Sequence, residues 1–345
     1  MRCLRRAVLL QLASRCRGLS LVELLVAMAL GMLLSAGMVS LFLESRRQYF
    51  YDEQLSRLQE NGRYAINLLS RELAMAGFFA TVLDRKTLAT QPVSRDCSDL
   101  NWALNPVTAV DMVNDHLPSS VAMDTVQGAL LNCVDGRAVV ALSDALIIKR
   151  VAGRASLREG KIASNLTSSS TLQWYLRVED DVAPRWEKRA AADLSALAWS
   201  GDSASYWEAI THIFYIRDYS DAENRADKLP TLCIEGLVND LMSTRCLVEG
   251  VENLQIELGL DTDGDGIANR YAGAPLAHEV ALAVSVRVSL LLRSTQSLAG
   301  YRDDKDYRVG PLSIAAPQDA FLRRVFTTTV QLRNVLRPVA DQGKI

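Results

Sequence analysis

One apolar stretch near the N-terminus constrains this chain more than any other feature. Residues 19–43, LSLVELLVAMALGMLLSAGMVSLFL, contain a single charged side chain, Glu23. Roughly 20 helical residues cross a bilayer core of about 30 Å, so the stretch predicts one membrane-spanning helix. The 18 residues before it carry five arginines and no acidic residue. Because positive charge stays on the cytoplasmic side of a span, we expect a cytoplasmic N-terminus and a periplasmic remainder.

The order of these signals differs from that of an ordinary cleaved signal peptide, which has its cleavage site after the apolar region. Here Arg17 and Gly18 lie directly before the apolar run, and Glu23 lies inside it. A carboxylate in hydrocarbon costs about 3 kcal/mol or more, so Glu23 is expected to have a functional partner. The alternative is an uncleaved signal anchor in which Gly18 and Glu23 are accidental.

Residues 17–23, RGLSLVE, followed by an apolar helix, resemble the prepilin leader of type IV pilins and type II secretion pseudopilins. The resemblance implies that a prepilin peptidase cuts after Gly18 and methylates the new amine of Leu19. It also implies that Glu23 meets the N-terminal amine of a neighbouring subunit during assembly. Most relatives carry phenylalanine or methionine in place of Leu19, and the leader is longer than usual. Its removal would change the formal charge from −2 to −7, because five arginines leave.

A helical pattern continues beyond the span. Apolar or small residues recur there at steps of three and four: Tyr51, Leu55, Leu58, Gly62, Ile66, Leu69, Leu73 and Ala76. No proline precedes Pro92, so one helix is predicted over about residues 19–79. We expect a leader (1–18), a transmembrane and assembly half-helix (19–43), an amphipathic half-helix (44–80) and an exported head (81–345). A dimeric coiled coil is the alternative for the amphipathic half, although a folded head favours packing onto it.

The head is predicted to be α+β, with the long helix packed on an antiparallel sheet. Runs rich in β-branched and aromatic residues lie at 138–142, 145–151, 172–178, 211–217, 254–260, 280–292 and 325–332. Strand and helix patterns do not alternate regularly, which argues against a parallel βαβ arrangement. Strict alternation in residues 284–290 predicts that one face of this strand packs inside the protein and that the other meets water.

Several blocks resemble the PilW group of minor pilins more specifically. They are residues 247–255 (LVEGVENLQ), the aspartate-rich loop after them, and residues 326–334 (FTTTVQLRN). Residues 86–210 match nothing specific, and we expect them to hold group-specific loops and partner surface. The resemblance implies an inner-membrane assembly protein that joins the pilus fibre. Its implied partners are other minor and major pilins, prepilin peptidase and the pilus assembly machinery, in a priming complex at the pilus tip.

Cysteine usage agrees with export, because four of the six cysteines follow the span: Cys97, Cys133, Cys233 and Cys246. Four thiols allow three connectivities. Pairing of sequence neighbours would give Cys97–Cys133 and Cys233–Cys246, which is the pairing we predict. Zinc ligation is the rival interpretation, but there is no Cys-x-x-Cys spacing and the three histidines are scattered.

Residues 261–269, DTDGDGIAN, form the one loop with recognisable site chemistry. Three carboxylates at alternate positions can converge on one cation: Asp261, Asp263 and Asp265. Gly266 permits the sharp turn that such convergence needs. The spacing is typical of the start of an EF-hand loop and predicts Ca²⁺ as the ion.

Further oxygen ligands would come from the Ile267 carbonyl and the Asn269 side chain. Ala272 stands where an EF-hand has its bidentate glutamate, so affinity should be weaker unless another residue such as Glu279 completes the shell. The alternative is a solvated polar turn, because Asp-Gly pairs often join strands.

Catalytic and nucleic-acid functions have no support in the sequence. We find no Gly-x-Ser-x-Gly elbow, phosphate-binding loop, paired histidines or dinucleotide fingerprint, so no enzyme is expected. A pI near 6.0 argues against bulk nucleic-acid binding. The resemblance to the PilW group favours a minor pilin as the function. The alternatives are a minor pseudopilin of a type II secretion system and a calcium-dependent adhesin or DNA-binding tip module.

Overall fold

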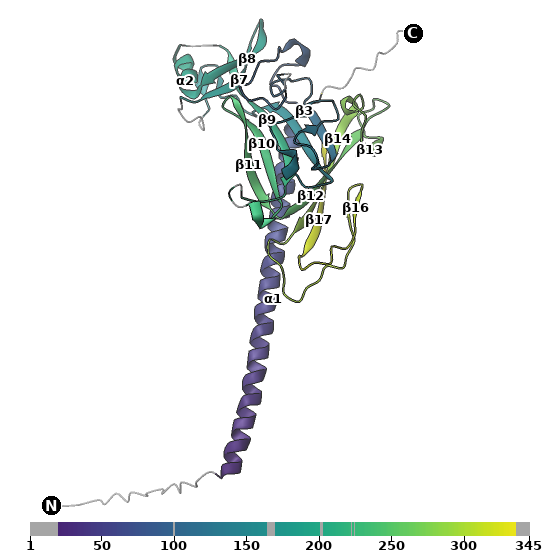
Figure 1. Cartoon of the computed structure of the whole chain (residues 1–345). Helices are drawn as coiled ribbons and strands as arrows, with labels where there is room; N and C mark the ends of the chain where they lie inside the picture. The colour runs from purple at the N-terminus through teal and green to yellow at the C-terminus, as the bar shows by residue number, and fades with distance from the viewer. Residues whose placement is uncertain are drawn as a thin grey trace, which may run out of the picture. The chain divides into compact units, whose positions relative to one another are not determined.

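The computed structural model describes residues 20–98, 101–163, 170–200, 203–221, 223 and 225–335 (Figure 1). The chain divides into two units, residues 1–52 and 53–345. Helix α1, Leu21–Met75, begins in the first unit and ends in the second. Its N-terminal part is exposed and has a mean hydropathy of 2.2, long and apolar enough to cross a membrane. The α+β class with a long apolar helix is confirmed.

Within the second unit, the end of α1 packs on the head. Its buried residues follow the helical repeat: Gln54, Leu58, Gly62, Ala65, Leu69 and Leu73. The predicted stripe is therefore right from Leu58 onward and wrong at Tyr51, which is exposed. The helix ends four residues before the predicted limit, and Gly77 follows at a φ of 75°. Glycine adopts this left-handed conformation without steric cost, and its N–H donates to the Lys149 carbonyl over 3.0 Å.

Gly62 lets the helix approach the head closely. A Cβ atom placed on Gly62 would lie 2.3 Å from a ring carbon of Phe326, which belongs to strand β17, Arg323–Gln331. We expect Gly62→Val to lower the free energy of unfolding by about 1–3 kcal/mol, because the packed ring must move. Urea unfolding followed by tryptophan fluorescence measures this.

The control for that variant is Arg63→Val, which adds the same β-branched side chain at an exposed position of α1. In a double-mutant cycle, Gly62→Val combined with Phe326→Ala should cost clearly less than the two single changes added together. Additive costs would contradict a direct contact between the two positions.

The larger sheet has nine strands, all paired antiparallel. Its main path runs through β1 (Val110–His116), β4 (Ser143–Val151), β9 (Ser205–Arg217), β10 (Thr231–Val238) and β11 (Leu241–Glu249). The remaining strands attach to β9 or to each other: β5 (Leu157–Arg158), β6 (Lys161–Ile162), β7 (Leu172–Glu179) and β8 (Val182–Ala190). Helix α2, Ala191–Ser200, follows β8 directly (Figure 1).

The smaller sheet has four antiparallel strands in the order β13 (Arg270–Ala272), β12 (Val251–Leu260), β14 (Ala283–Arg293) and β17. Two short hairpins are separate from it: β2 (Met123–Asp124) with β3 (Leu130–Leu131), and β15 (Tyr307–Val309) with β16 (Leu312–Ile314). Four short 3₁₀ helices complete the described elements: η1 (Arg85–Thr87), η2 (Gly136–Ala138), η3 (Arg225–Asp227) and η4 (Val280–Leu282).

Buried hydrogen bonds join the two sheets. The Asp144 carboxylate on β4 accepts the N–H of Ile256 on β12 over 2.7 Å and the N–H of Asp115 over 2.8 Å. On the same strands, Ser143 Oγ accepts the Leu254 N–H over 3.2 Å. Burial raises the pKa of Asp144 to about 7. Buried hydrogen bonds therefore hold the two sheets together in addition to apolar packing.

The head contains two disulfides, with the neighbour pairing expected from the sequence. Cys97–Cys133 crosslinks the loop before β1 to the segment after β3. Cys233–Cys246 joins facing residues of β10 and β11. Both bonds close loops in the unfolded chain, which reduces its conformational entropy.

Three strand predictions are wrong in detail. Residues 280–282, predicted as the start of a strand, form the 3₁₀ helix η4. Residues 138–142 form no strand, because Asp135 caps η2 and Leu142 turns the chain at a φ of 56°. Strand β14 does not expose one face to water, since most of its residues are buried. The β15–β16 hairpin covers that face: a Cβ atom on Gly310 would lie 3.8 Å from Ser289 Oγ.

Candidate functional sites

A reciprocal pair of hydrogen bonds caps the N-terminus of α1. The Ser20 N–H donates to Glu23 Oε2 over 2.9 Å, and the Glu23 N–H donates to Ser20 Oγ over 3.2 Å. This is a capping box, which satisfies N–H groups that the first helical turn leaves unpaired. A carboxylate here also interacts favourably with the helix dipole. Glu23 thus has a local role at the N-terminus of the helix, while Gly18 and Leu19 lie outside the described residues.

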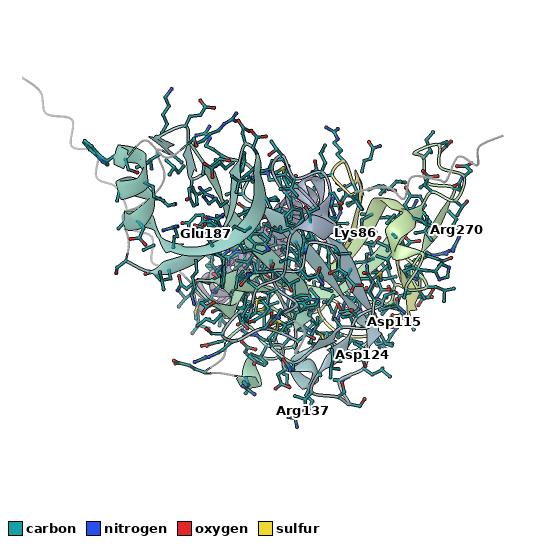
Figure 2. All side chains as sticks on the ribbon, turned by 90° about the horizontal axis from the view of Figure 1, so that it is seen from above. Lys86, Asp115, Asp124, Arg137, Glu187 and Arg270 are labelled. Atoms are coloured by element: carbon teal, nitrogen blue, oxygen red, sulfur yellow. A yellow bond between two sulfur atoms is a disulfide. The ribbon has the colours of Figure 1, made fainter. Side chains whose placement is uncertain are left out.

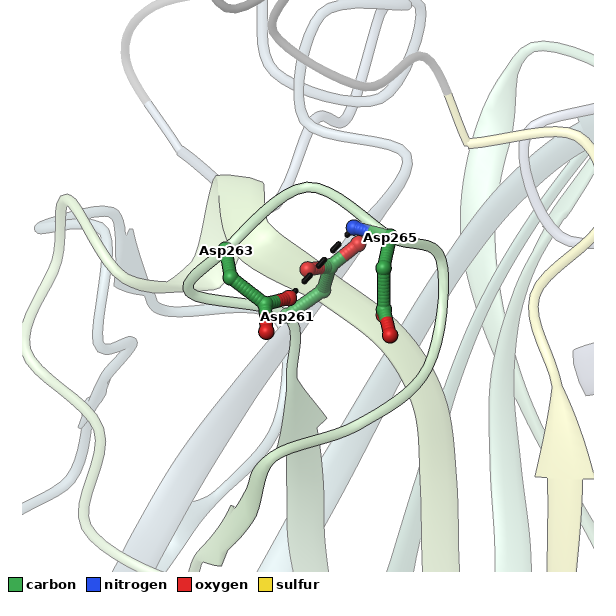
Figure 3. A group of neighbouring side chains, drawn as sticks. All are labelled: Asp261, Asp263 and Asp265. Atoms are coloured by element: carbon green, nitrogen blue, oxygen red, sulfur yellow. Dashed lines mark hydrogen bonds between the residues drawn. The ribbon is translucent and has the colours of Figure 1, made fainter.

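The aspartate-rich loop connects β12 to β13 (Figure 3). Oxygens of its three carboxylates lie within 4.8 Å of one another: Asp261, Asp263 and Asp265. Asp261 is buried, and the other two are exposed. The sequence therefore placed the three acidic side chains together correctly. Such a cluster could bind a metal ion, because like charges so close repel unless a cation lies between them.

The backbone shapes the loop around Asp261. Its two carboxylate oxygens accept the N–H groups of Gly264 over 2.6 Å and Gly266 over 2.7 Å. Both glycines have a positive φ, 82° and 90°, a conformation that other residues adopt only with strain. The Asp265 N–H in turn lies 3.4 Å from Asp263 Oδ1. The glycines thus let the chain turn tightly enough to bring the alternate carboxylates together.

The other predicted ligands make hydrogen bonds or ion pairs of their own. Asn269 lies beside the cluster, where its Nδ2 donates to Asp263 Oδ2 over 3.0 Å and its Oδ1 accepts the Thr262 N–H over 2.6 Å. Ile267 donates its N–H to Asp265 over 2.7 Å. Glu279 is outside the acidic cluster and pairs with Arg270. Asn269 therefore directs its amide nitrogen toward the acidic cluster and its oxygen toward Thr262, and Glu279 is held by Arg270.

A second charged cluster attaches α1 to the larger sheet. Glu72 on the helix accepts hydrogen bonds from Arg150 Nη2 over 2.8 Å and Nε over 3.1 Å, and His212 Nδ1 lies 3.3 Å away. Burial raises the pKa of Glu72, but hydrogen bonds and charge attraction from His212 and Arg150 outweigh it and lower the pKa to about 2. Sequence reasoning missed this contact because its partners are far apart along the chain.

Comparison with known families adds two matches. The family described as Type IV Pilus-assembly protein W matches residues 213–334, from within β9 to just beyond the end of β17. The prokaryotic N-terminal methylation motif matches residues 13–39, which include Gly18, Leu19 and Glu23. No curated protein and no solved structure matches.

The two matched regions lie at opposite ends of the chain and agree with its architecture. The methylation motif covers the start of the exposed apolar helix, and the assembly-protein match covers the smaller sheet and the aspartate-rich loop. Both matches are to structural, non-enzymatic proteins of the pilin type, and the apolar helix with the methylation motif indicates a place at the membrane or in the pilus. Residues 213–334 are thus similar to the PilW family of type IV pilus assembly proteins, and residues 13–39 carry the prepilin-type N-terminal methylation motif.

Proposed function

We propose that this chain is a minor pilin that takes part in a priming or tip complex during type IV pilus assembly. The observation that carries the proposal is the pair of family matches on one chain, with the methylation motif at the apolar helix and the PilW match on the head. Its direct partners are then other minor and major pilins, prepilin peptidase and the assembly machinery of the inner membrane. The PilW match favours a pilus over the pseudopilus of a type II secretion system.

The proposal assigns a role to each part of the chain. Residues 1–18 are the leader, 19–43 the assembly half of the helix, 44–80 its amphipathic half, and 81–345 a periplasmic head. The five leader arginines support a cytoplasmic N-terminus. The two disulfides support an oxidising compartment for the head.

Glu23 is the assembly carboxylate in this proposal. Once a neighbouring helix packs beside it in hydrocarbon, the carboxylate needs a partner, and the methylated amine of a neighbouring Leu19 supplies one. The capping box supports this role, because it keeps the carboxylate at the N-terminal end of α1. Glu23→Ala is expected to leave cleavage intact and to reduce incorporation of the subunit into pili, measured by immunoblotting of sheared fibres.

Leader processing is the direct test of the proposed function. Coexpression with a prepilin peptidase should yield a chain that begins at methylated Leu19, and Gly18→Ala should leave the chain uncut, because the glycine after which the peptidase cuts is lost. Intact mass and N-terminal sequencing report both results. An N-terminus at Met1 in both proteins would identify an ordinary signal anchor instead.

A deletion strain separates the pilus from the pseudopilus. Deletion should abolish twitching motility and surface pili while leaving secretion through a type II system intact. The reverse phenotype would assign the chain to the secretion system.

We further propose that the aspartate-rich loop binds Ca²⁺ through Asp261, Asp263 and Asp265, with the Ile267 carbonyl and Asn269 as additional ligands. The supporting observation is the convergence of three carboxylates around two glycine turns. Ca²⁺ at 100 times its dissociation constant should stabilise the head by about 2.7 kcal/mol, and a chelator should remove the gain. Thermal unfolding with and without Ca²⁺ measures the shift.

The matched variants for the calcium test are Asp263→Asn with Asp265→Asn, which should abolish the calcium-dependent shift. Asp304→Asn removes an exposed carboxylate outside the loop and should leave the shift unchanged. An identical melting temperature with and without Ca²⁺ in the unaltered protein would show that the loop is a solvated turn.

A further inference from the structure

Strand β17 forms one edge of the smaller sheet and pairs only with β14 (Figure 1). Two flanking hydrogen bonds fix the direction of its backbone groups. The Ser294 N–H donates to the Leu322 carbonyl over 2.8 Å, and the Leu332 N–H donates to the Val284 carbonyl over 2.8 Å. In an antiparallel pair, the N–H and C=O of alternate residues point toward the neighbouring strand. The even-numbered residues of β17 therefore pair with β14, and the odd-numbered residues direct their N–H and C=O outward.

The outward backbone groups of β17 form an open edge. They belong to Val325, Thr327, Thr329 and Gln331. Among the described residues, none of these N–H and C=O groups has a backbone partner on the outer side. Thr327, Thr329 and Gln331 are exposed. Helix α1 contacts β17 through one face of the strand, where Gly62 lies against the Phe326 ring, and not along its edge.

The other long edge strands carry features that hinder pairing with another chain. Strand β8 contains Pro184 and a charged cluster centred on Glu187 (Figure 2). Strands β1 and β11 already form hydrogen bonds with loops, through the Met112 carbonyl and the Met242 N–H. At the other edge of the smaller sheet, β13 has only three residues. Such features are usual at sheet edges, because unpaired backbone groups are a template for another strand.

Strand β17 lacks these features. Residues 325–331, VFTTTVQ, contain no charged residue and no proline, and their pairing with β14 is free of bulges. Five of these seven residues are β-branched, which favours an extended strand. Phe326, Thr328 and Val330 point toward the helix side and are only half-buried. A further strand beside β17 would therefore gain backbone hydrogen bonds and bury more apolar surface.

The charge at the ends of this stretch indicates which strand fits. Two exposed arginines bound it, Arg324 before it and Arg333 after it. In the described part of the chain, no carboxylate pairs with either guanidinium. A segment that is uncharged in its middle and has a carboxylate at one end complements this edge, whereas a basic segment would be repelled.

We propose that the β17 edge pairs with an extended segment of a neighbouring pilin head, which adds a strand to the smaller sheet. Only an extended polypeptide offers N–H and C=O groups at the two-residue spacing of this edge. The segment is uncharged opposite residues 325–331 and carries a carboxylate beside Arg324 or Arg333. The proposal rests on the proposed role in pilus assembly, since assembly supplies the neighbouring head.

Site-specific photocrosslinking in piliated cells tests the proposal on the full-length chain. With p-benzoylphenylalanine in place of Gln331, illumination should join the chain to another pilin, at an uncharged segment next to a carboxylate. Introduced instead at Trp199, which is 91% exposed on α2, the same probe should not give this product. Mass spectrometry identifies the joined peptides. A product with a second copy of this chain, a link to residues 336–345 of the same chain, or no product would overturn the proposal.

A matched pair of variants separates backbone pairing from side-chain contact. Thr329→Pro removes one outward N–H and leaves the hydrogen bonds to β14 in place, whereas Thr329→Ala removes the same side chain and keeps the N–H. Thr329→Pro should reduce the Gln331 crosslink by at least about fivefold, the effect of one lost hydrogen bond, and Thr329→Ala should not. Both variants should melt within about 4 °C of the unaltered protein. Equal crosslink yields in the two variants would contradict strand pairing.

Hydrogen exchange tests the open edge without any substitution. In the detergent-solubilised, unassembled protein, the N–H groups of Thr327 and Thr329 should exchange at least about tenfold faster than those of Phe326 and Thr328, which pair with β14. Mass spectrometry with electron-transfer fragmentation resolves the individual amides. Equal rates would show that the chain itself covers this edge and would overturn the proposal. Failure of edge pairing would leave leader cleavage and the deletion phenotype as expected, so it is distinguishable from failure of the proposed pilin function.

Discussion

Replacing Arg323 with methionine is expected to lower the free energy of unfolding of the head by about 3–5 kcal/mol, because the change leaves a buried charge without its partner. The Arg323 side chain is 2% exposed, and the side chain of its partner Asp303 is 0% exposed. Their closest atoms are 3.1 Å apart. Among the described residues, Asp303 keeps hydrogen bonds from Tyr307 in this variant, and these do not neutralise its charge.

Arg323 also forms two forked contacts with less buried carboxylates. Its guanidinium reaches Glu252 over 2.6 and 2.9 Å and Asp319 over 2.6 and 2.7 Å. Glu252 belongs to β12 and Asp319 to the segment between β16 and β17. One side chain thereby ties a long irregular segment to the smaller sheet, so its loss should loosen residues 294–322 as well as lower stability.

Urea unfolding of the detergent-solubilised full-length protein measures the effect of Arg323→Met. Arg308→Met, at an exposed position on β15, is the control and should change stability by less than about 0.5 kcal/mol. Adding Asp303→Asn to Arg323→Met should recover part of the loss, because the orphaned charge is removed. Equal free energies of unfolding for Arg323→Met and the unaltered protein would show that the cluster makes no net contribution to stability.

The sequence predicted the parts of the fold that repeat a local pattern. The apolar span and the buried stripe from Leu58 to Leu73 follow the helical period, and strands β4, β7, β12, β14 and β17 follow runs of β-branched residues. Strand β8 was missed because it is an edge strand with a proline, Pro184, and several charged side chains. Edge strands are often built this way, and apolar alternation does not reveal them.

The candidate sites also differ in whether their residues are close together or far apart in the sequence. The three aspartates of the loop are two residues apart, so local backbone geometry brings them together and the sequence shows it. Glu72 is separated from Arg150 by 78 residues and from His212 by 140, and Arg323 is separated from Glu252 by 71, so these contacts form only when distant segments pack together. No local pattern encodes such contacts.

Lys149 gives the second large expected effect, which depends on pH. Its ammonium is buried, donates to the Trp102 carbonyl over 2.5 Å and to Thr108 Oγ1 over 3.2 Å, and lies 3.9 Å from the centre of the Trp102 ring. Burial lowers the pKa of Lys149 to about 7, although the charges of Asp96 and Asp111 partly oppose the shift.

The sign of the pH effect follows from proton uptake. An unfolded lysine has a pKa of about 10.4, so between pH 7 and pH 10 the unfolded chain holds more protons at this position than the folded chain. The free energy of unfolding should therefore rise with pH in this range, by roughly 2 kcal/mol from pH 7 to pH 9. Below pH 7 the contribution of Lys149 becomes constant, because the side chain is then protonated in both states.

Comparison with Lys149→Met isolates this contribution. Methionine fills a similar volume without a charge, so the variant should lose the rise with pH, whereas the exposed-site control Lys161→Met should keep it. Urea unfolding at pH 7, 8 and 9 gives the change of the free energy of unfolding with pH for the unaltered protein and for each of the two variants. Asp144, whose pKa burial raises to about 7, acts in the opposite direction near pH 7, so the difference between variant and unaltered protein is the quantity to compare. Parallel pH profiles of the two proteins would mean that Lys149 stays protonated in the fold, held by Asp96, Asp111 and the Trp102 ring.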